Sequence, residues 1–130
     1  MPVRIVRLGD PRSAGEGLRI GTVRRPPRGV PKAEFAARDF YDVWLPNLAP
    51  SAALMQDGRA AETDAQWQSF ARRYTAEMKA PDCVHLLDTL AALSHHAAFA
   101  VGCYCTDDAR CHRSLLRGLL AERGAVMSDK

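Results

Sequence analysis

A dense group of reactive side chains lies near the C-terminus of this 130-residue chain. Three of the four cysteines, one histidine and two arginines fall within positions 103–113. They are Cys103, Cys105, Arg110, Cys111, His112 and Arg113. Thiolates and imidazoles bind soft metal ions or act in nucleophilic chemistry, and guanidinium groups hold anions. Three kinds of site are therefore open at this turn.

A metal site would use Cys103, Cys105, Cys111 and His112 as ligands. These soft donors suit zinc or iron. The usual paired Cys-x-x-Cys knuckles are absent from the segment. We also expect the side chains of Cys111 and His112 to diverge as neighbours on a helix, which argues against all four residues binding one ion.

A reactive-thiol site would use Cys111 and His112 as its catalytic pair. Cys111 is expected at the N-terminus of a helix beside basic side chains, and both features lower the pKa of a cysteine. Cys105 is placed to resolve an oxidised Cys111. The charges of Asp107 and Asp108 partly cancel the local positive field.

An anion-binding site would combine the same helix N-terminus with arginines. A second cationic loop, Arg24-Arg25-Pro26-Pro27-Arg28-Gly29, follows an expected strand. If the strands before the two loops are neighbours, Arg24 and Arg28 meet Cys105 and Arg113. Together these residues would hold a phosphate or carboxylate group.

Strands are expected in front of both loops. Residues Val3 to Leu8 alternate apolar and charged side chains, as a half-buried strand does. Leu18 to Val23 predicts a second short strand. Residues 97–105 predict a third, with its two cysteines on one face. The segment from Asp42 to Leu45 is compatible with a strand or an extended loop.

Helical periodicity marks the remaining segments. The expected helices cover residues 31–40, a brief stretch capped by Ser51, residues 64–79, a stretch capped by Asp82, and residues 111–123. The clearest is 64–79, where Thr63 and Gln66 form a capping box before an apolar stripe. Gly124 is expected to end the last helix.

The order of these elements predicts the fold class. A helix, a strand, a turn and a second helix at the end of the chain imply a parallel crossover. We therefore expect an α/β fold, a small single-domain sandwich over residues 1–130 with a short, mostly parallel sheet flanked by helices. Open α/β sheets bind ligands at the C-terminal ends of their strands, where both loops are expected.

Charge and hydropathy narrow the range of partners. No apolar run approaches a bilayer span, and Met1-Pro2-Val3-Arg4 lacks the core of a signal peptide, so we expect a cytoplasmic protein with free thiols and no membrane partner. Residues 1–38 hold nine Lys or Arg against three acidic residues. Nucleic-acid binding through this basic third is one alternative function. Few aromatic residues accompany the arginines, which gives single-strand stacking little support.

Four blocks of the sequence occur in an order found in a known family. They are Arg24-x-x-Pro27-Arg28-Gly29, Trp44-Leu45-x-x-Leu48-Ala49-Pro50-Ser51, Trp67-x-x-Phe70-x-x-Arg73-Tyr74, and the Cys-His-Arg turn. Together they resemble the domain-of-unknown-function 488 (YeaO-like) family over nearly the whole chain. The resemblance implies a fold and a site, because the family has no settled activity. Val23 and Pro26 stand where the family usually has an aspartate and a tryptophan.

The sequence thus predicts a small anionic or nucleotide-like ligand at the Cys-His-Arg turn. Arg24, Arg28 and Arg113 would hold the anion, and Cys111 and His112 would orient it or react with it, which is compatible with an enzyme. A metal-binding or thiol redox module built on the same cluster is the main alternative, with zinc or iron as the expected ion.

Overall fold

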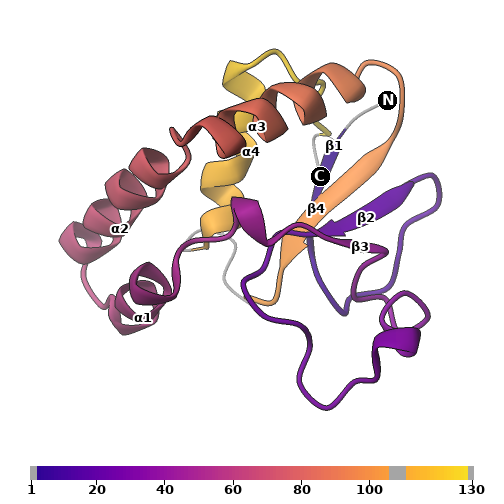
Figure 1. Cartoon of the computed structure of the whole chain (residues 1–130), viewed down its shortest axis with the longest axis horizontal. Coiled ribbons are helices and arrows are strands. Elements are labelled where there is room, and N and C mark those ends of the chain that lie inside the picture. The colour runs from indigo at the N-terminus through magenta and orange to yellow at the C-terminus, as the bar shows by residue number, and fades with distance from the viewer. Residues whose placement is uncertain (1–2, 106–110, 129–130) are drawn as a thin grey trace.

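The computed structural model describes residues 3–105 and 111–128. Within these residues the chain forms a four-stranded sheet, four α-helices and two short 3-10 helices (Figure 1). The strands are β1 Val3–Arg7, β2 Leu18–Gly21, β3 Val43–Trp44 and β4 Phe99–Cys103. The helices are α1 Ala52–Ala60, α2 Asp64–Glu77, α3 Pro81–Leu93 and α4 His112–Glu122, with η1 Lys32–Glu34 and η2 Pro46–Leu48. The predicted α/β class is confirmed.

The sheet is parallel throughout its described strands, in the order β1-β4-β2-β3. All five residues of β4 are buried, as expected for an interior parallel strand covered on both faces. Val3 of β1 and Leu18 of β2 both pair with Phe99 of β4. Because the three strands start level, their C-terminal ends meet beside Cys103.

The helices gather on one side of the sheet (Figure 1). The main core lies between them and includes Val3, Ile20 and Val101 from the strands. A smaller apolar cluster contains Tyr41 and Cys103 together with partly buried Phe35 and Phe40. The Tyr41 ring packs on Gly21, where an added Cβ would collide with it. The cysteine turn therefore starts between two packed regions.

Several predicted caps are confirmed. The Ser51 hydroxyl accepts a hydrogen bond from the Leu54 backbone at 3.3 Å and begins α1. Thr63 and Gln66 form the expected reciprocal capping box at the start of α2. Gly124, with φ of 83°, follows the last turn of α4, since glycine adopts this left-handed conformation without strain.

Two local predictions are wrong. Residues 31–40 form only the short η1, which ends at Glu34 and is followed by turns that include Asp39 at a φ of 63°. Asp82 does not cap α3. The N-cap is Ala80, two residues earlier, and the helix begins at Pro81, which suits the first helical position because it has no N–H to leave unpaired. None of the described helices is both long and apolar enough to span a bilayer.

A glycine pair tests the packing just before the cysteine turn. A Cβ at Gly102 would collide with the Val6 carbonyl of β1, whereas Gly118 on α4 has open space. We expect Gly102→Ala to lower the free energy of unfolding by about 1–3 kcal/mol. The control Gly118→Ala should raise it by about 0.5–1 kcal/mol through helix propensity. Urea denaturation measures both, and equal effects would contradict the strand packing.

Candidate functional site

The C-terminal ends of β2 and β4 bring the two predicted loops together. Thr22, directly after β2, donates from its backbone N–H and from its hydroxyl to the Gly102 carbonyl, each at 3.0 Å. Farther along, the Tyr104 hydroxyl donates to the Arg25 carbonyl at 2.9 Å. The cationic loop and the cysteine turn therefore lie side by side, because β2 and β4 are neighbours in the sheet.

Cys103, Cys111 and His112 form a compact cluster at this end of the sheet. Their candidate ligand atoms all lie within 4.8 Å of one another, and the three residues are only 1%, 2% and 3% exposed. The expectation that Cys111 and His112 diverge is wrong. Cys111 is the N-cap of α4, with an extended backbone at φ −137° and ψ 148°. Its Sγ atom consequently lies 3.9 Å from Nδ1 of His112.

The imidazole of His112 is held in one tautomer. Its Nε2 atom lies 2.7 Å from the Thr22 carbonyl, and because a carbonyl only accepts, Nε2 must carry the hydrogen. Burial lowers the pKa of His112, so the neutral ring presents a lone pair at Nδ1. That atom faces Cys111. The Nδ1 atom of such an imidazole can bind a metal ion or accept a proton from a thiol.

Cys105 places a third thiol beside the cluster, although it is not among the three residues whose donor atoms lie within 4.8 Å of one another. It is half-buried and lies two residues beyond the end of β4. Hydrogen bonds from Cys103 and Cys111 hold the pKa of Cys105 far below its usual range. The hydrogen bond to Cys105 raises the pKa of Cys103 to about 12, and hydrogen bonds with Cys103 and Cys105 raise the pKa of Cys111. The pKa is thus lowered for Cys105 and raised for the buried Cys111, so Cys105 is the thiol expected to react.

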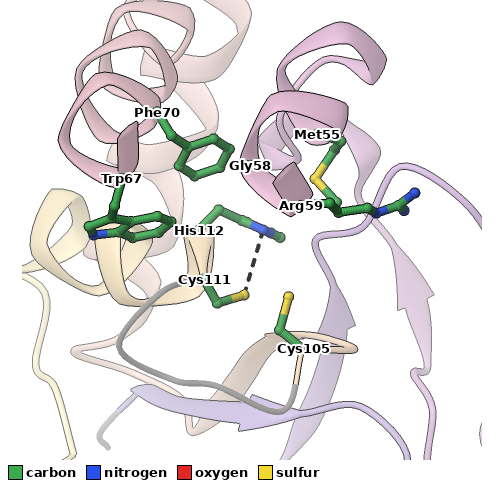
Figure 2. A pocket seen from close by; sticks show the side chains of 8 residues that line it. All are labelled: Met55, Gly58, Arg59, Trp67, Phe70, Cys105, Cys111 and His112. Atoms are coloured by element: carbon green, nitrogen blue, oxygen red, sulfur yellow. Dashed lines mark hydrogen bonds between the residues drawn. The ribbon is translucent and has the colours of Figure 1, made fainter. Parts of the chain in front are cut away.

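A cavity of about 100 Å³ adjoins the cluster. Its lining comes from the cysteine turn and from two helices, and comprises Cys105, Cys111, His112, Met55, Gly58, Arg59, Trp67 and Phe70 (Figure 2). Figure 2 shows the sulfur atoms of Cys105 and Cys111 and the His112 ring facing a common space. A small molecule in the cavity would therefore contact the reactive groups directly.

The comparison with known proteins agrees with the blocks read from the sequence. Residues 3–124 match the family model DUF488-N3a, described as the active DUF488-N3 subclade. This chain belongs to the DUF488 family. No curated protein and no solved structure matches it. The match in the DUF488 chain includes the cysteine turn and the two helices that line the cavity.

Two predicted anion-binding residues of this DUF488 chain lie away from the cavity lining. The Arg24 guanidinium donates to the carbonyls of Ala49 and Pro50 at 3.2 Å and 3.1 Å, just before α1. Arg28 is exposed on the loop that follows β2. An anion-holding role for either arginine stays a prediction.

Arg113 of this DUF488 chain does not line the cavity, although its positive charge helps to lower the pKa of Cys105. It is 2% exposed and lines a second hollow beside β1, together with Arg4 and Arg7. Its proposed contact with the ligand of the cysteine turn also stays a prediction. Asp107, Asp108 and Arg110 lie outside the described residues.

Sequence reasoning missed the helical side of the site. Met55 and Arg59 come from α1, a short helix for which the sequence indicated a cap and no function. Trp67 and Phe70 belong to the apolar stripe expected on residues 64–79. Phe70 is part of the main core and Trp67 packs against it, and both also line the cavity. The one signal for their role was the Trp67-x-x-Phe70 block, whose order matches the family.

The reactivity of the thiols tests the charge distribution in the cluster. In DUF488 protein freed of metal by a chelator, iodoacetamide should modify Cys105 first, because thiolates are the reacting species. Its rate should stay nearly constant from about pH 5 to pH 8, whereas an ordinary thiol gains about tenfold per pH unit there. Peptide mapping by mass spectrometry identifies the modified residue. Buried Cys83, whose pKa is raised by burial, serves as the slow internal control. Faster labelling of Cys111 would contradict this assignment.

Proposed function

We propose that this DUF488 chain binds a zinc or iron ion through Cys103, Cys111 and His112, with Cys105 as the fourth ligand. The observation that carries the proposal is the convergence of three buried donor atoms within 4.8 Å. Tetrahedral zinc with bonds of about 2.3 Å to sulfur places its ligands about 3.8 Å apart. Small side-chain adjustments bring the cluster to that spacing.

The donor chemistry and the orientation of the histidine both support a soft metal ion. Thiolate and imidazole ligands select zinc and iron over magnesium and calcium, which prefer oxygen. Metal-binding histidines usually donate their second ring N–H to a carbonyl or carboxylate. The bond from Nε2 of His112 to the Thr22 carbonyl has that form and aims Nδ1 at the sulfur atoms.

The position of the cluster favours a role beyond structural support. It lies at the C-terminal ends of parallel strands, where α/β proteins place their ligand sites. A bound ion would supply Lewis acidity beside the cavity. The chain's own residues would orient a small molecule there, and Trp67 and Phe70 would exclude water from one wall. In this proposal, the anionic ligand expected from the sequence binds in this cavity.

A reactive-thiol function is the second candidate, favoured by the low pKa and partial exposure of Cys105. In this function Cys105 would be the nucleophile, and the thiols of Cys103 and Cys111 would stabilise its negative charge. Metal content separates the two candidate functions, because only the first requires a bound ion. Alkylation separates them as well, since a metal-bound Cys105 is protected while a free thiolate reacts.

Nucleic-acid binding receives less support. Among the basic residues of the first 38 positions, Arg7, Arg12, Arg19 and Arg38 form ion pairs with acidic side chains. Arg19 is 1% exposed, so it presents no charge to a phosphate backbone. Much of the positive charge counted in the sequence is thus neutralised within the domain.

The metal proposal is tested by metal content after purification without a chelator or an affinity tag. We expect about one zinc or iron ion per chain, measured by plasma mass spectrometry. Cys103→Ser and His112→Ala each remove a ligand and should weaken binding by at least about 10- to 100-fold.

Cys83→Ser is the matched control for these variants. Cys83 is also buried, but its Sγ donates to the Asn47 carbonyl at 3.2 Å, a bond that a serine hydroxyl can replace. This variant should keep the wild-type metal content. Metal-free wild-type protein that also fails to bind added zinc or iron would overturn the proposal.

A further inference from the structure

We infer that Cys105 is an exchangeable ligand, and that the cavity admits a small thiol-bearing or similar soft-donor molecule with an anionic group at its outer end. The donor atom would replace Cys105 at the metal ion, and the anionic group would lie near Arg59. This inference rests on the proposed metal centre. It names the class of molecule that the centre receives.

The four candidate ligands differ in their accessibility. Cys103, Cys111 and His112 are at least nine-tenths buried, whereas Cys105 is half-buried and lines the cavity. Cys105 also lies beyond the end of β4, while Cys103 is fixed in the strand and Cys111 caps α4. The positions of the three buried residues are thus fixed by β4 and by the start of α4. Catalytic metal sites commonly have three such protein ligands and one exchangeable position.

The cavity opens on the exchangeable side of the cluster. Met55 and Gly58 of α1 and Trp67 and Phe70 of α2 stand opposite Cys105 (Figure 2). Its volume of about 100 Å³ is smaller than the roughly 150 Å³ that holds a benzene ring. A few heavy atoms fit inside, and a whole nucleotide does not. The molecule therefore inserts a short head and leaves the rest of its structure outside.

The apolar wall of the cavity is built from aromatic rings that pack on one another. The Trp67 ring stacks on Phe70 with ring centroids 4.9 Å apart, and Phe70 stacks on Tyr74 at 6.4 Å. The Tyr74 ring in turn lies beside the imidazole of His112, with ring centroids 5.6 Å apart. The Tyr74 hydroxyl donates to the Leu48 carbonyl at 2.7 Å. Such a wall favours a short apolar stem between the donor atom and the outer group.

Arg59 sets the charge preference at the outer end. It is exposed, it lines the cavity, and no ion pair or hydrogen bond is found for its guanidinium among the described residues. The nearby acidic residue Asp57 is already paired with Arg73 at 2.7 Å. Figure 2 shows the Arg59 guanidinium extending away from the sulfur atoms. A carboxylate outside the cavity can reach it, and guanidinium groups match carboxylates well.

The exchange is a ligand substitution without oxidation or reduction. The sulfur of the incoming thiol gives an electron pair to the metal ion, and the bond between the ion and Cys105 breaks. The Cys105 sulfur keeps its electron pair and takes the proton that the incoming thiol releases. Atoms, charge and electrons balance without another reactant.

Cobalt(II)-loaded full-length protein provides the test, because its visible spectrum reports the ligands of the ion. The probe is 3-mercaptopropionate, and its neutral analogue 3-mercaptopropanol is the matched ligand. Both are titrated into wild type, Cys105→Ser, Arg59→Gln and the control Arg72→Gln, an exposed arginine outside the cavity. Cobalt retention after desalting shows that the probe does not simply remove the ion.

We expect saturable spectral changes, with binding to Cys105→Ser at least about tenfold tighter, since no tethered thiolate competes. Wild type and Arg72→Gln should prefer the carboxylate probe by about two- to fivefold, and Arg59→Gln should lose that preference. If cobalt binds but neither probe changes the spectrum, or Cys105→Ser loses the ion, the site is closed and this inference is overturned while the metal centre stands. If wild type binds no cobalt, zinc or iron, the proposed function itself is overturned.

Discussion

The hydrogen bond from Nε2 of His112 to the Thr22 carbonyl is the constraint on which the site depends. It links the first residue of α4 to the residue after β2, 90 positions earlier in the chain. It fixes both the tautomer and the direction of the imidazole, so that the lone pair of Nδ1 is presented to the sulfur atoms. The carbonyl is itself fixed, because Thr22 is bound through its N–H and its hydroxyl to Gly102 of β4.

The backbone of the sheet thus orients the His112 side chain at the cysteine turn. The parallel register sets the ends of β2 and β4 level, and the extended N-cap conformation of Cys111 turns its sulfur towards the ring. Just before α1, whose residues line the cavity, the Arg24 guanidinium donates to the carbonyls of Ala49 and Pro50. We interpret Arg24 as a residue that positions the cavity wall from a distance.

The sequence was sufficient to predict the architecture. Apolar periodicity, the capping box at Thr63 and the strand-turn-helix order at the C-terminus each depend on local chemistry, and each is confirmed. The details that failed depend on a single backbone angle or on tertiary contacts. Turns that include the positive φ of Asp39 replace most of a predicted helix, and the extended Cys111 reverses the expected divergence from His112. Arg59 and Met55 come from a separate helix, and no spacing along the chain relates them to the cysteines.

X-ray absorption spectroscopy of the metal-loaded full-length chain tests the central claim most directly, since it measures the atoms around the ion. The account predicts, for zinc, two or three sulfur neighbours at about 2.3 Å and one nitrogen at about 2.0 Å. The His112→Ala variant should lose the nitrogen contribution. A shell made only of oxygen and nitrogen, or one unchanged by His112→Ala, would contradict a metal centre at this cluster.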